Sequence, residues 1–254
     1  MNRKRMQTNG FIIHRNILSV EECERIKSHN LDYWNHSDIM WELRSHPAIK
    51  QLFADLWNVP SDDLLTSFDG IYHRKPHESF SLPWHMDHNA SHPFDKMSSV
   101  QGILAMSNID ESTGGTQLLP GSHLRTKALC YRHGIDDLHD TWEFTEVPDD
   151  DRIFSMGLLP LQPVLQTGDV LLWDSRLLHR VVEPNDPATS RWTAYLSMVP
   201  RSMVSESVLE KRKDAFEKGI ATTHWVQTFI DRGGVRSRPN EYLLTDSRVT
   251  QMVY

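Results

Sequence analysis

GDVLLWDSRLLHRVVEPNDPATSRWTAYLSMV, residues 168 to 199, holds two apolar runs on either side of a segment rich in Pro, Asn and Asp. Similar short runs occur earlier in the chain, from residue 64 onward, and Gly, Pro, Asn and Asp separate them. This spacing of short strands and turns is typical of a double-sheet β structure. The sequence therefore predicts a mostly β protein with flanking helices, built on a double-stranded β-helix core of the jelly-roll or cupin-like kind.

Helical patterns flank this β region on both sides. Ser19 has the position of a helix N-cap, and Glu22 three residues later completes a capping box. A second helix is predicted from Pro47 to Trp57, where apolar residues recur at helical spacing. A third helix, with mixed charges on a solvated face, is predicted from Glu206 to Lys218.

The remaining segments suggest one domain. GFIIHRNIL, residues 10 to 18, is predicted to contain a strand after a short tail. The polar, acidic stretch from Tyr131 to Arg152 is predicted to be a surface insertion, and the tail from Arg232 carries few packing signals. Since no repeat or linker interrupts the sequence, we expect a single domain over residues 1–254 with its β core at about 64–200.

The composition narrows the class of function. With 254 residues and 39% hydrophobic content, the chain can bury a substantial core. Its net charge of −7 argues against nucleic-acid or anionic-membrane binding, because phosphate binding depends on clustered Lys and Arg. The start MNRKR lacks the apolar region of a signal peptide, and no stretch approaches the ~20 apolar residues of a membrane span. The two cysteines, Cys23 and Cys130, fit reduced thiols, so we expect a cytoplasmic protein. We also expect a monomer or a homodimer.

The triplet His85-Met86-Asp87 lies between two predicted strands. With 14 histidines and 21 aspartates in 254 residues, chance alone gives about one such triplet. A second one, His36-Ser37-Asp38, falls in a predicted helical region, where side chains at i and i+2 diverge by ~200°. In an extended segment, His85 and Asp87 point the same way and can bind one ion. We interpret only that pair as candidate metal ligands.

A third ligand is available at His179, to which the predicted strand around residues 170–174 leads. Two histidines and one carboxylate with open coordination positions are characteristic of non-haem Fe(II) oxygenases. This mixture of nitrogen and oxygen ligands suits Fe(II) better than a structural zinc. Taken alone, His179 fits a histidine at the barrel rim better than a ligand, so the interpretation depends on the residues that follow it.

The strand predicted after residue 190 puts Arg191 and Thr193 on one face, with Tyr195 and Ser197. A guanidinium and a hydroxyl on the same side can together bind one carboxylate. If this face is the barrel interior, a guanidinium without an anion there would be costly, and a bound dicarboxylate would supply that anion. The alternative is a partly exposed arginine paired with an acidic side chain.

A further segment, GGTQLLPGSHLR (residues 114 to 125), ends a predicted strand in a tight turn where Gly121 can take a positive φ. The order HxD, PGSH, GD…H and R-x-T, over about residues 64 to 200, resembles the phytanoyl-CoA dioxygenase family of Fe(II)/2-oxoglutarate-dependent oxygenases. GFIIHRNILSVEEC also resembles the usual opening of that family.

This resemblance implies Fe(II), the cosubstrate 2-oxoglutarate and O2, and hydroxylation of a C–H bond with release of succinate and CO2. The implied catalytic metal ligands are His85, Asp87 and His179. Arg191 would bind the distal carboxylate of 2-oxoglutarate with help from Thr193, and Gln101 would contact the cosubstrate or the substrate. A carboxylate in the metal-binding triplet favours hydroxylation over halogenation.

Polar residues around the triad indicate a small polar or charged substrate. The candidate contacts are Asp69, Tyr72, Arg74, His88, Asn89, Trp173 and Arg176. Two alternatives stay open: a protein- or nucleic-acid-modifying 2-oxoglutarate oxygenase would share the triad, and a cupin-like metal protein without oxygenase activity would share the fold. Cupins usually carry HxH followed by Glu, which HMDHN does not offer.

Overall fold

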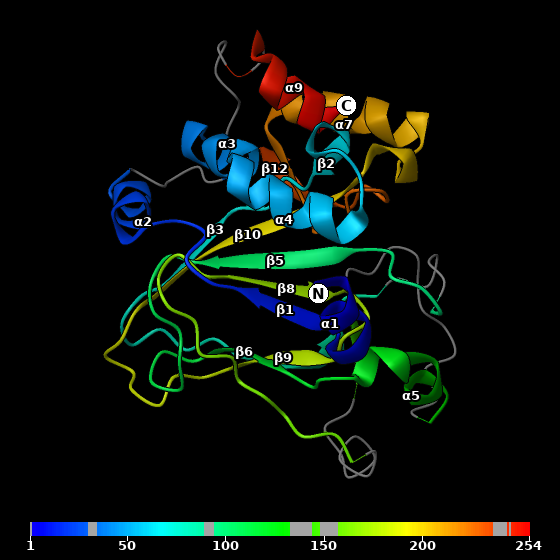
Figure 1. The fold of residues 1–254 in the computed structure, drawn as a ribbon. Coiled ribbons are helices and arrows are strands. Elements are labelled where there is room, and N and C mark those ends of the chain that lie inside the picture. The colour runs from blue at the N-terminus through cyan, green and yellow to red at the C-terminus, as the bar shows by residue number, and fades with distance from the viewer. Residues whose placement is uncertain are drawn as a thin grey trace.

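The computed structural model describes residues 2–29, 35–88, 94–132, 144–147, 157–235, 243 and 245–254. Two antiparallel sheets form the centre of the molecule, and a layer of helices covers the larger one (Figure 1). The larger sheet has the order β1-β8-β5-β10-β2, and β3 also pairs with β10. Its strands are β1 (Phe11–His14), β8 (Val170–Asp174), β5 (Val100–Ala105), β10 (Arg191–Pro200), β2 (Leu64–Thr66) and β3 (Ile71–Arg74).

The smaller sheet has the order β6-β9-β4-β7. Its strands are β6 (Gly115–Leu118), β9 (His179–Val182), β4 (Leu82–Met86) and β7 (Thr145–Glu146). A separate hairpin pairs β11 (Ile220–Thr222) with β12 (Asp231–Val235). The predicted fold class is confirmed: the protein is mostly β with flanking helices and has a jelly-roll core. The larger sheet also takes in β1, from outside residues 64–200.

The helices of the described residues are α1 (Asn2–Asn9), α2 (Val20–Lys27), α3 (Asp38–Ser45), α4 (Pro47–Trp57), α5 (Thr126–Arg132), α7 (Glu206–Lys218) and α9 (Ser247–Val253), with short 3-10 turns η1 (Ser61–Asp63), η2 (Ser122–Leu124) and η3 (Arg201–Met203). Side chains cap the N-termini of α2, α3 and α9. Ser19 and Glu22 exchange the two hydrogen bonds of the predicted capping box. The bounds predicted for α4 and α7 are confirmed.

Four segments differ from the predictions. The tail before β1 forms α1, and the tail after Arg232 contributes α9, whose Val249 and Met252 are buried. The predicted insertion from Tyr131 to Arg152, partly outside the described residues, supplies β7, which pairs with β4. The second HxD triplet begins just before α3 instead of within a helix, and its Ser37 caps that helix.

The two faces of the larger sheet have different neighbours. Ala194 and Leu196 of β10 belong to the core cluster that includes Phe53 of α4, so they face the helices. Ile103 of β5 and Leu171 of β8 instead cluster with residues of the smaller sheet, in the space between the sheets. Since side chains alternate along β10, Arg191 and Thr193 point into that inner space.

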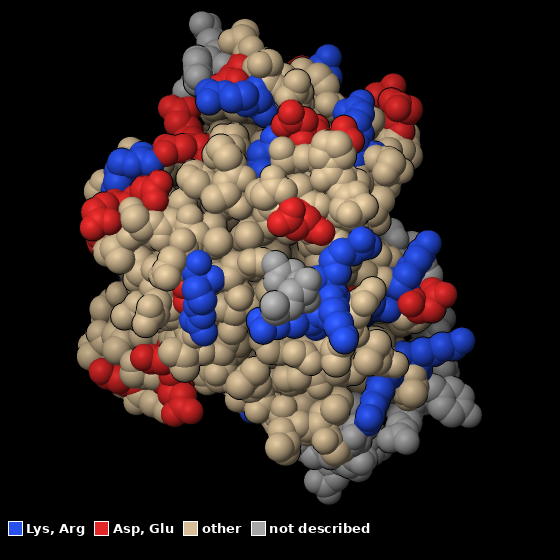
Figure 2. Space-filling view, in the orientation of Figure 1, with Lys and Arg blue, Asp and Glu red and all other residues tan. Residues whose placement is uncertain are grey.

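No helix in the described ranges is long and apolar enough to cross a bilayer. On the face drawn in Figure 2, basic side chains gather near α1, where Arg3, Lys4 and Arg5 are exposed, and acidic side chains are scattered over the rest. The charge of this face is therefore mixed, although the net charge of the chain is −7.

Candidate active site

His85, Asp87 and His179 lie together at one end of the two sheets. His85 of β4 is directly opposite His179 of β9, and Asp87 follows β4 by one residue. One nitrogen or oxygen atom from each of the three residues lies within 4.8 Å of the others. Oδ2 of Asp87 is 2.9 Å from Nε2 of His179, and Oδ1 is 3.8 Å from Nε2 of His85. No other group of this kind occurs among the residues that the structure describes.

Main-chain carbonyls orient both imidazoles. Nδ1 of His85 donates to the carbonyl of Pro83 at 2.7 Å, and Nδ1 of His179 donates to the carbonyl of Leu177 at 2.9 Å. With the proton held on Nδ1, the Nε2 lone pairs are available on the side of Asp87. Two imidazole nitrogens and one carboxylate fit the ligand set of a non-haem Fe(II) centre. The three residues can therefore hold such an ion.

The electrostatics of the triad favour positive charge beside Asp87. Burial alone would raise the pKa of Asp87, but the adjacent His179 outweighs it and holds that pKa below its usual range. Burial, and secondly the neighbouring His179, lower the pKa of His85 to about 4. Burial also opposes protonation of His179, yet the Asp87 carboxylate raises the pKa of His179. A bound cation would take over the role of that proton.

Two further side chains hold Asp87. Nε2 of Gln101, on β5, donates to Oδ2 of Asp87, so the side chain predicted to contact a cosubstrate or substrate instead binds the carboxylate of the triad. Nε2 of His224 is 3.4 Å from the main-chain carbonyl of Asp87 and donates to it. The sequence pattern did not mark His224, because no ligand-like spacing surrounds it.

Arg191 and Thr193 place a guanidinium and a hydroxyl in the space between the sheets. The Arg191 side chain is 4% exposed, and a Cβ built on Gly115 would lie 3.0 Å from its Nη1, so the guanidinium reaches β6 of the smaller sheet. Nη1 of Arg191 and Oγ1 of Thr193 have no hydrogen-bond partner within the described part of the chain. Burial lowers the pKa of Arg191, and the Tyr72 ring lies 5.9 Å from its Cζ. This arrangement can accept an anion.

Two predicted substrate contacts are occupied by the protein itself. The guanidinium of Arg74 donates to the carbonyls of Thr113 and Thr189 and to Oγ1 of Thr189. The guanidinium of Arg176 forms an ion pair with Asp174, 2.6 Å between Nη2 and Oδ2. Both guanidinium groups therefore stabilise loops of the fold.

Other predicted contacts lie nearer the triad. The Trp173 ring is 5.3 Å from the His179 ring, and its Nε1 has no partner among the described residues. The His88 ring is 4.5 Å from Phe94. Tyr72, half-buried, lies beside Arg191, whereas the main-chain carbonyl of Asp69 accepts from Arg44. Asn89 lies outside the described residues.

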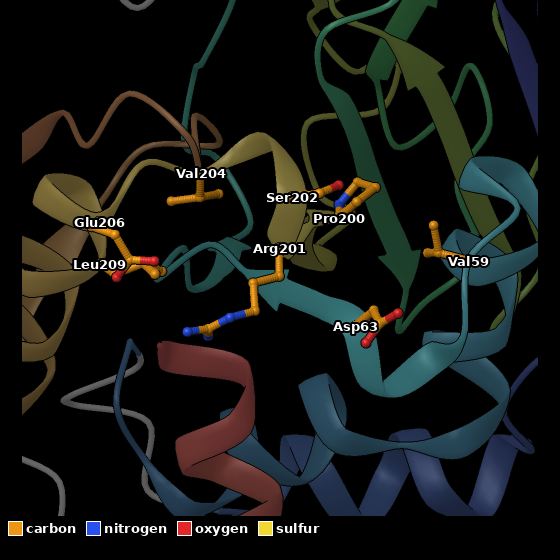
Figure 3. Close-up of a pocket in the computed structure, with 8 residues that line it drawn as sticks. All are labelled: Val59, Asp63, Pro200, Arg201, Ser202, Val204, Glu206 and Leu209. Atoms are coloured by element: carbon orange, nitrogen blue, oxygen red, sulfur yellow. The ribbon is translucent and has the colours of Figure 1, made fainter.

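A surface groove lies elsewhere, where β10 ends (Figure 3). Its volume is about 510 Å³, and it is lined by Val59, Asp63, Pro200, Arg201, Ser202, Val204, Glu206 and Leu209. Pro200 is at the opposite end of β10 from Arg191. Since no predicted site residue lines the groove, the geometry gives it no part in the chemistry of the triad.

The model of the family described as phytanoyl-CoA dioxygenase (PhyH) matches residues 28–183. The chain belongs to the phytanoyl-CoA dioxygenase family. The resemblance predicted from the sequence is thus confirmed. The matched residues include the triad and end before Arg191 and His224.

Relatives of this family member include Ava biosynthesis cluster protein O from Aspergillus versicolor, 30% identical over 213 residues. That alignment covers 77% of this chain and 66% of the relative, so the chain spans slightly less than two thirds of that protein. GlcNAc Inducible Gene 2 from Candida albicans has a similar fold, with a TM-score of 0.69 and 16% identity over 99% of this chain and 75% of its own.

The epimerase SnoN, solved in complex with Fe3+, alpha ketoglutarate and nogalamycin RO, is also similar in fold. Its TM-score is 0.58 at 16% identity, over 78% of this chain and 82% of its own. At these identities the likeness to the solved structures shows the fold.

Proposed function

We propose that the protein is an Fe(II)- and 2-oxoglutarate-dependent oxygenase that hydroxylates a C–H bond of a small polar molecule. The observation that carries the proposal is the combination of a buried His-Asp-His triad with the buried guanidinium of Arg191, whose Nη1 has no hydrogen-bond partner among the described residues. Membership of the phytanoyl-CoA dioxygenase family supports this class of enzyme, and the Fe3+ and alpha ketoglutarate bound to SnoN support the same metal and cosubstrate.

The triad would bind the metal from one side. Nε2 of His85, Nε2 of His179 and a carboxylate oxygen of Asp87 would be the protein ligands, leaving the remaining coordination positions for cosubstrate and oxygen. The bound iron and 2-oxoglutarate would supply the oxidising chemistry, consuming O2 and releasing succinate and CO2. Gln101 would keep the Asp87 carboxylate in place through its hydrogen bond.

Arg191 and Thr193 would bind the distal carboxylate of 2-oxoglutarate. Thr193 pairs with Ala105, and Gln101 lies four residues earlier on β5, about 13 Å away along the strand. An arginine side chain and an extended dicarboxylate can together bridge that span. The apolar side chains of Ile103, Leu171 and Trp173 line the space between these levels and would keep water away from the reacting groups.

Tyr72, His88 and Trp173 are the proposed substrate contacts. We omit Arg74 and Arg176, because both guanidinium groups are already hydrogen-bonded within the fold. A polar metabolite fits the side chains that remain. The single-domain organisation, cytoplasmic location, monomeric or homodimeric state and lack of nucleic-acid binding stay predictions from the sequence.

Anaerobic titration with Fe(II) and 2-oxoglutarate tests the proposal. The expected result is a visible metal-to-ligand charge-transfer band, followed in air by uncoupled formation of succinate. His179→Ala should abolish both, whereas His73→Ala, which removes a ring stacked on Trp192 away from the triad, should abolish neither. Wild-type protein that binds no Fe(II), or no 2-oxoglutarate when iron is bound, would refute the proposed function. If a protein or nucleic acid is turned over as fast as a small polar molecule, the result would instead favour a macromolecule-modifying oxygenase.

A further inference from the structure

A segment from the C-terminal part of the chain packs against the metal end of the site. It connects β11 to β12 and lies outside residues 28–183, the part matched by the family. Thr223, Trp225 and Val226 are fully or almost fully buried in it. Burial this complete indicates that the segment is part of the folded body around the triad.

Two side chains of this segment bind main-chain carbonyls on opposite sides of the site. Nε2 of His224 donates to the carbonyl of Asp87 at 3.4 Å, and Nε2 of Gln227 donates to the carbonyl of Ser98 at 2.6 Å. Asp87 follows β4 of the smaller sheet, and Ser98 precedes β5 of the larger sheet. The segment therefore bridges the two sheets where both approach the metal ligands.

The bridge spans an important hydrogen bond. Gln101 lies near the start of β5, three residues after Ser98, and its amide donates to the Asp87 carboxylate. Anything that separates the end of β4 from the start of β5 would lengthen that bond and release the carboxylate. His224 holds the segment at the end of β4, and Gln227 holds the segment before β5.

The segment is itself anchored. Oγ1 of Thr222 accepts from the main-chain N–H of Phe68 at 3.0 Å, and the N–H of Thr223 donates to the carbonyl of Ile230 at 3.1 Å. Oγ1 of Thr223 accepts from the N–H of Trp225 at 3.2 Å. These bonds restrict the backbone on both sides of His224, so its imidazole has a defined position from which to act.

We propose that His224 and Gln227 are positioning residues for the metal centre. They hold the ends of β4 and β5 so that Gln101 keeps the Asp87 carboxylate in its metal-binding orientation. This inference rests on the proposed function, because it assigns the two residues a role toward the iron. It adds to the site a part of the chain that the family match does not include.

The chain offers a matched control in His36. This imidazole is also buried, and its Nε2 also donates to a main-chain carbonyl, that of Ile220, at 2.9 Å. It packs among Phe68, Trp41 and Phe216, among the helix-facing residues of the core. His36→Phe therefore removes the same kind of hydrogen bond from the same C-terminal region without touching a ligand.

The test measures Fe(II) affinity, the charge-transfer band and thermal unfolding anaerobically. His224→Phe should weaken Fe(II) binding about 10-fold, the lower end of what loss of an outer-shell partner costs, and should shift the band. His224→Gln keeps a side-chain N–H donor and should restore most of the affinity. His36→Phe should lower the unfolding temperature and leave Fe(II) affinity and the band unchanged.

The inference is overturned if His224→Phe binds Fe(II) and 2-oxoglutarate as wild type does, or if His36→Phe weakens iron binding equally. Should His224→Phe fail to fold, Gln227→Leu removes the bond to Ser98, and the same measurements on it support or overturn the inference in the same way. Wild-type protein that binds no iron overturns the proposed function itself. Normal wild-type binding with unaffected variants overturns only the role of the C-terminal segment.

Discussion

Replacing Arg191 by methionine should change stability and cosubstrate binding in opposite directions. The guanidinium is buried between the sheets, and its Nη1 lacks a partner among the described residues. A buried donor without a partner costs about 1–3 kcal/mol, more if it is charged. Methionine fills similar space without that cost, so the free energy of unfolding of the metal-free protein should rise by about 1–2 kcal/mol.

The same substitution should weaken 2-oxoglutarate binding. Each hydrogen bond from a charged group contributes about 1.5–3 kcal/mol, so losing two of them at the lower end costs about 3 kcal/mol, or roughly 100-fold in Kd. At a cosubstrate concentration of about 100 Kd, wild-type protein gains about 2.7 kcal/mol of stability from the ligand. The Arg191→Met protein should gain only about 0.4 kcal/mol at that concentration.

Denaturant unfolding with and without 2-oxoglutarate, under nitrogen with Fe(II), measures both effects in one experiment. Arg191→Lys is the control, because it keeps the charge but not the planar fork, and its affinity should be intermediate. If Arg191→Met is less stable than wild type and still binds 2-oxoglutarate normally, Arg191 is a structural residue and the assignment of a carboxylate site is wrong.

Three further predictions follow from the packing. The pKa of His36 lies at about 3, mainly because of burial and secondly because of Arg44, against 6.5 for the ordinary group. Below pH 6.5 the unfolded chain therefore binds a proton that the folded chain does not, and lowering the pH from 7.5 to 5 should cost about 2 kcal/mol at this residue. Urea unfolding at both pH values should show that loss in wild type and not in His36→Phe. At Gly115, φ is +136°, and an added Cβ would lie 3.0 Å from the Arg191 guanidinium. Gly115→Ala should therefore lower the stability measured by thermal unfolding by about 1–3 kcal/mol and weaken 2-oxoglutarate binding. Unchanged stability and binding would contradict the inner position of Arg191. Gln101→Leu should raise the Kd for Fe(II) by about 10-fold in anaerobic titrations, and an unaltered Kd would show that its hydrogen bond to Asp87 is dispensable.

The candidate metal site could be predicted because strand periodicity and chain order are local properties of the sequence. His85 and Asp87 share a side in an extended segment, and the strand β8 leads directly toward His179. The same alternation placed Arg191 and Thr193 on the inner side of β10, and the helices with clear capping or apolar signals formed with the expected bounds.

What the sequence missed depends on tertiary contacts. His224 reaches Asp87 only because the hairpin of β11 and β12 folds back over this residue, which lies 137 positions away in the sequence. The guanidinium of Arg176 looked available until the fold placed it on Asp174 and on the carbonyl of Phe94. In α1 only Met6 is buried among residues 3–9, so no apolar stripe announced a helix. Such partners cannot be read from local spacing.

The pairing of β1 with β8 has a consequence for synthesis of the protein on the ribosome. Phe11 pairs with Trp173, so the first strand has no partner until about 160 more residues have been made. At 5–20 residues per second, that wait is roughly 8–30 s. During it, a strand with the sequence FIIH exposes an unpaired edge, which is a template for aggregation. Yield in a heterologous host should therefore depend on translation speed and chaperone supply more than the equilibrium stability of the finished protein would suggest.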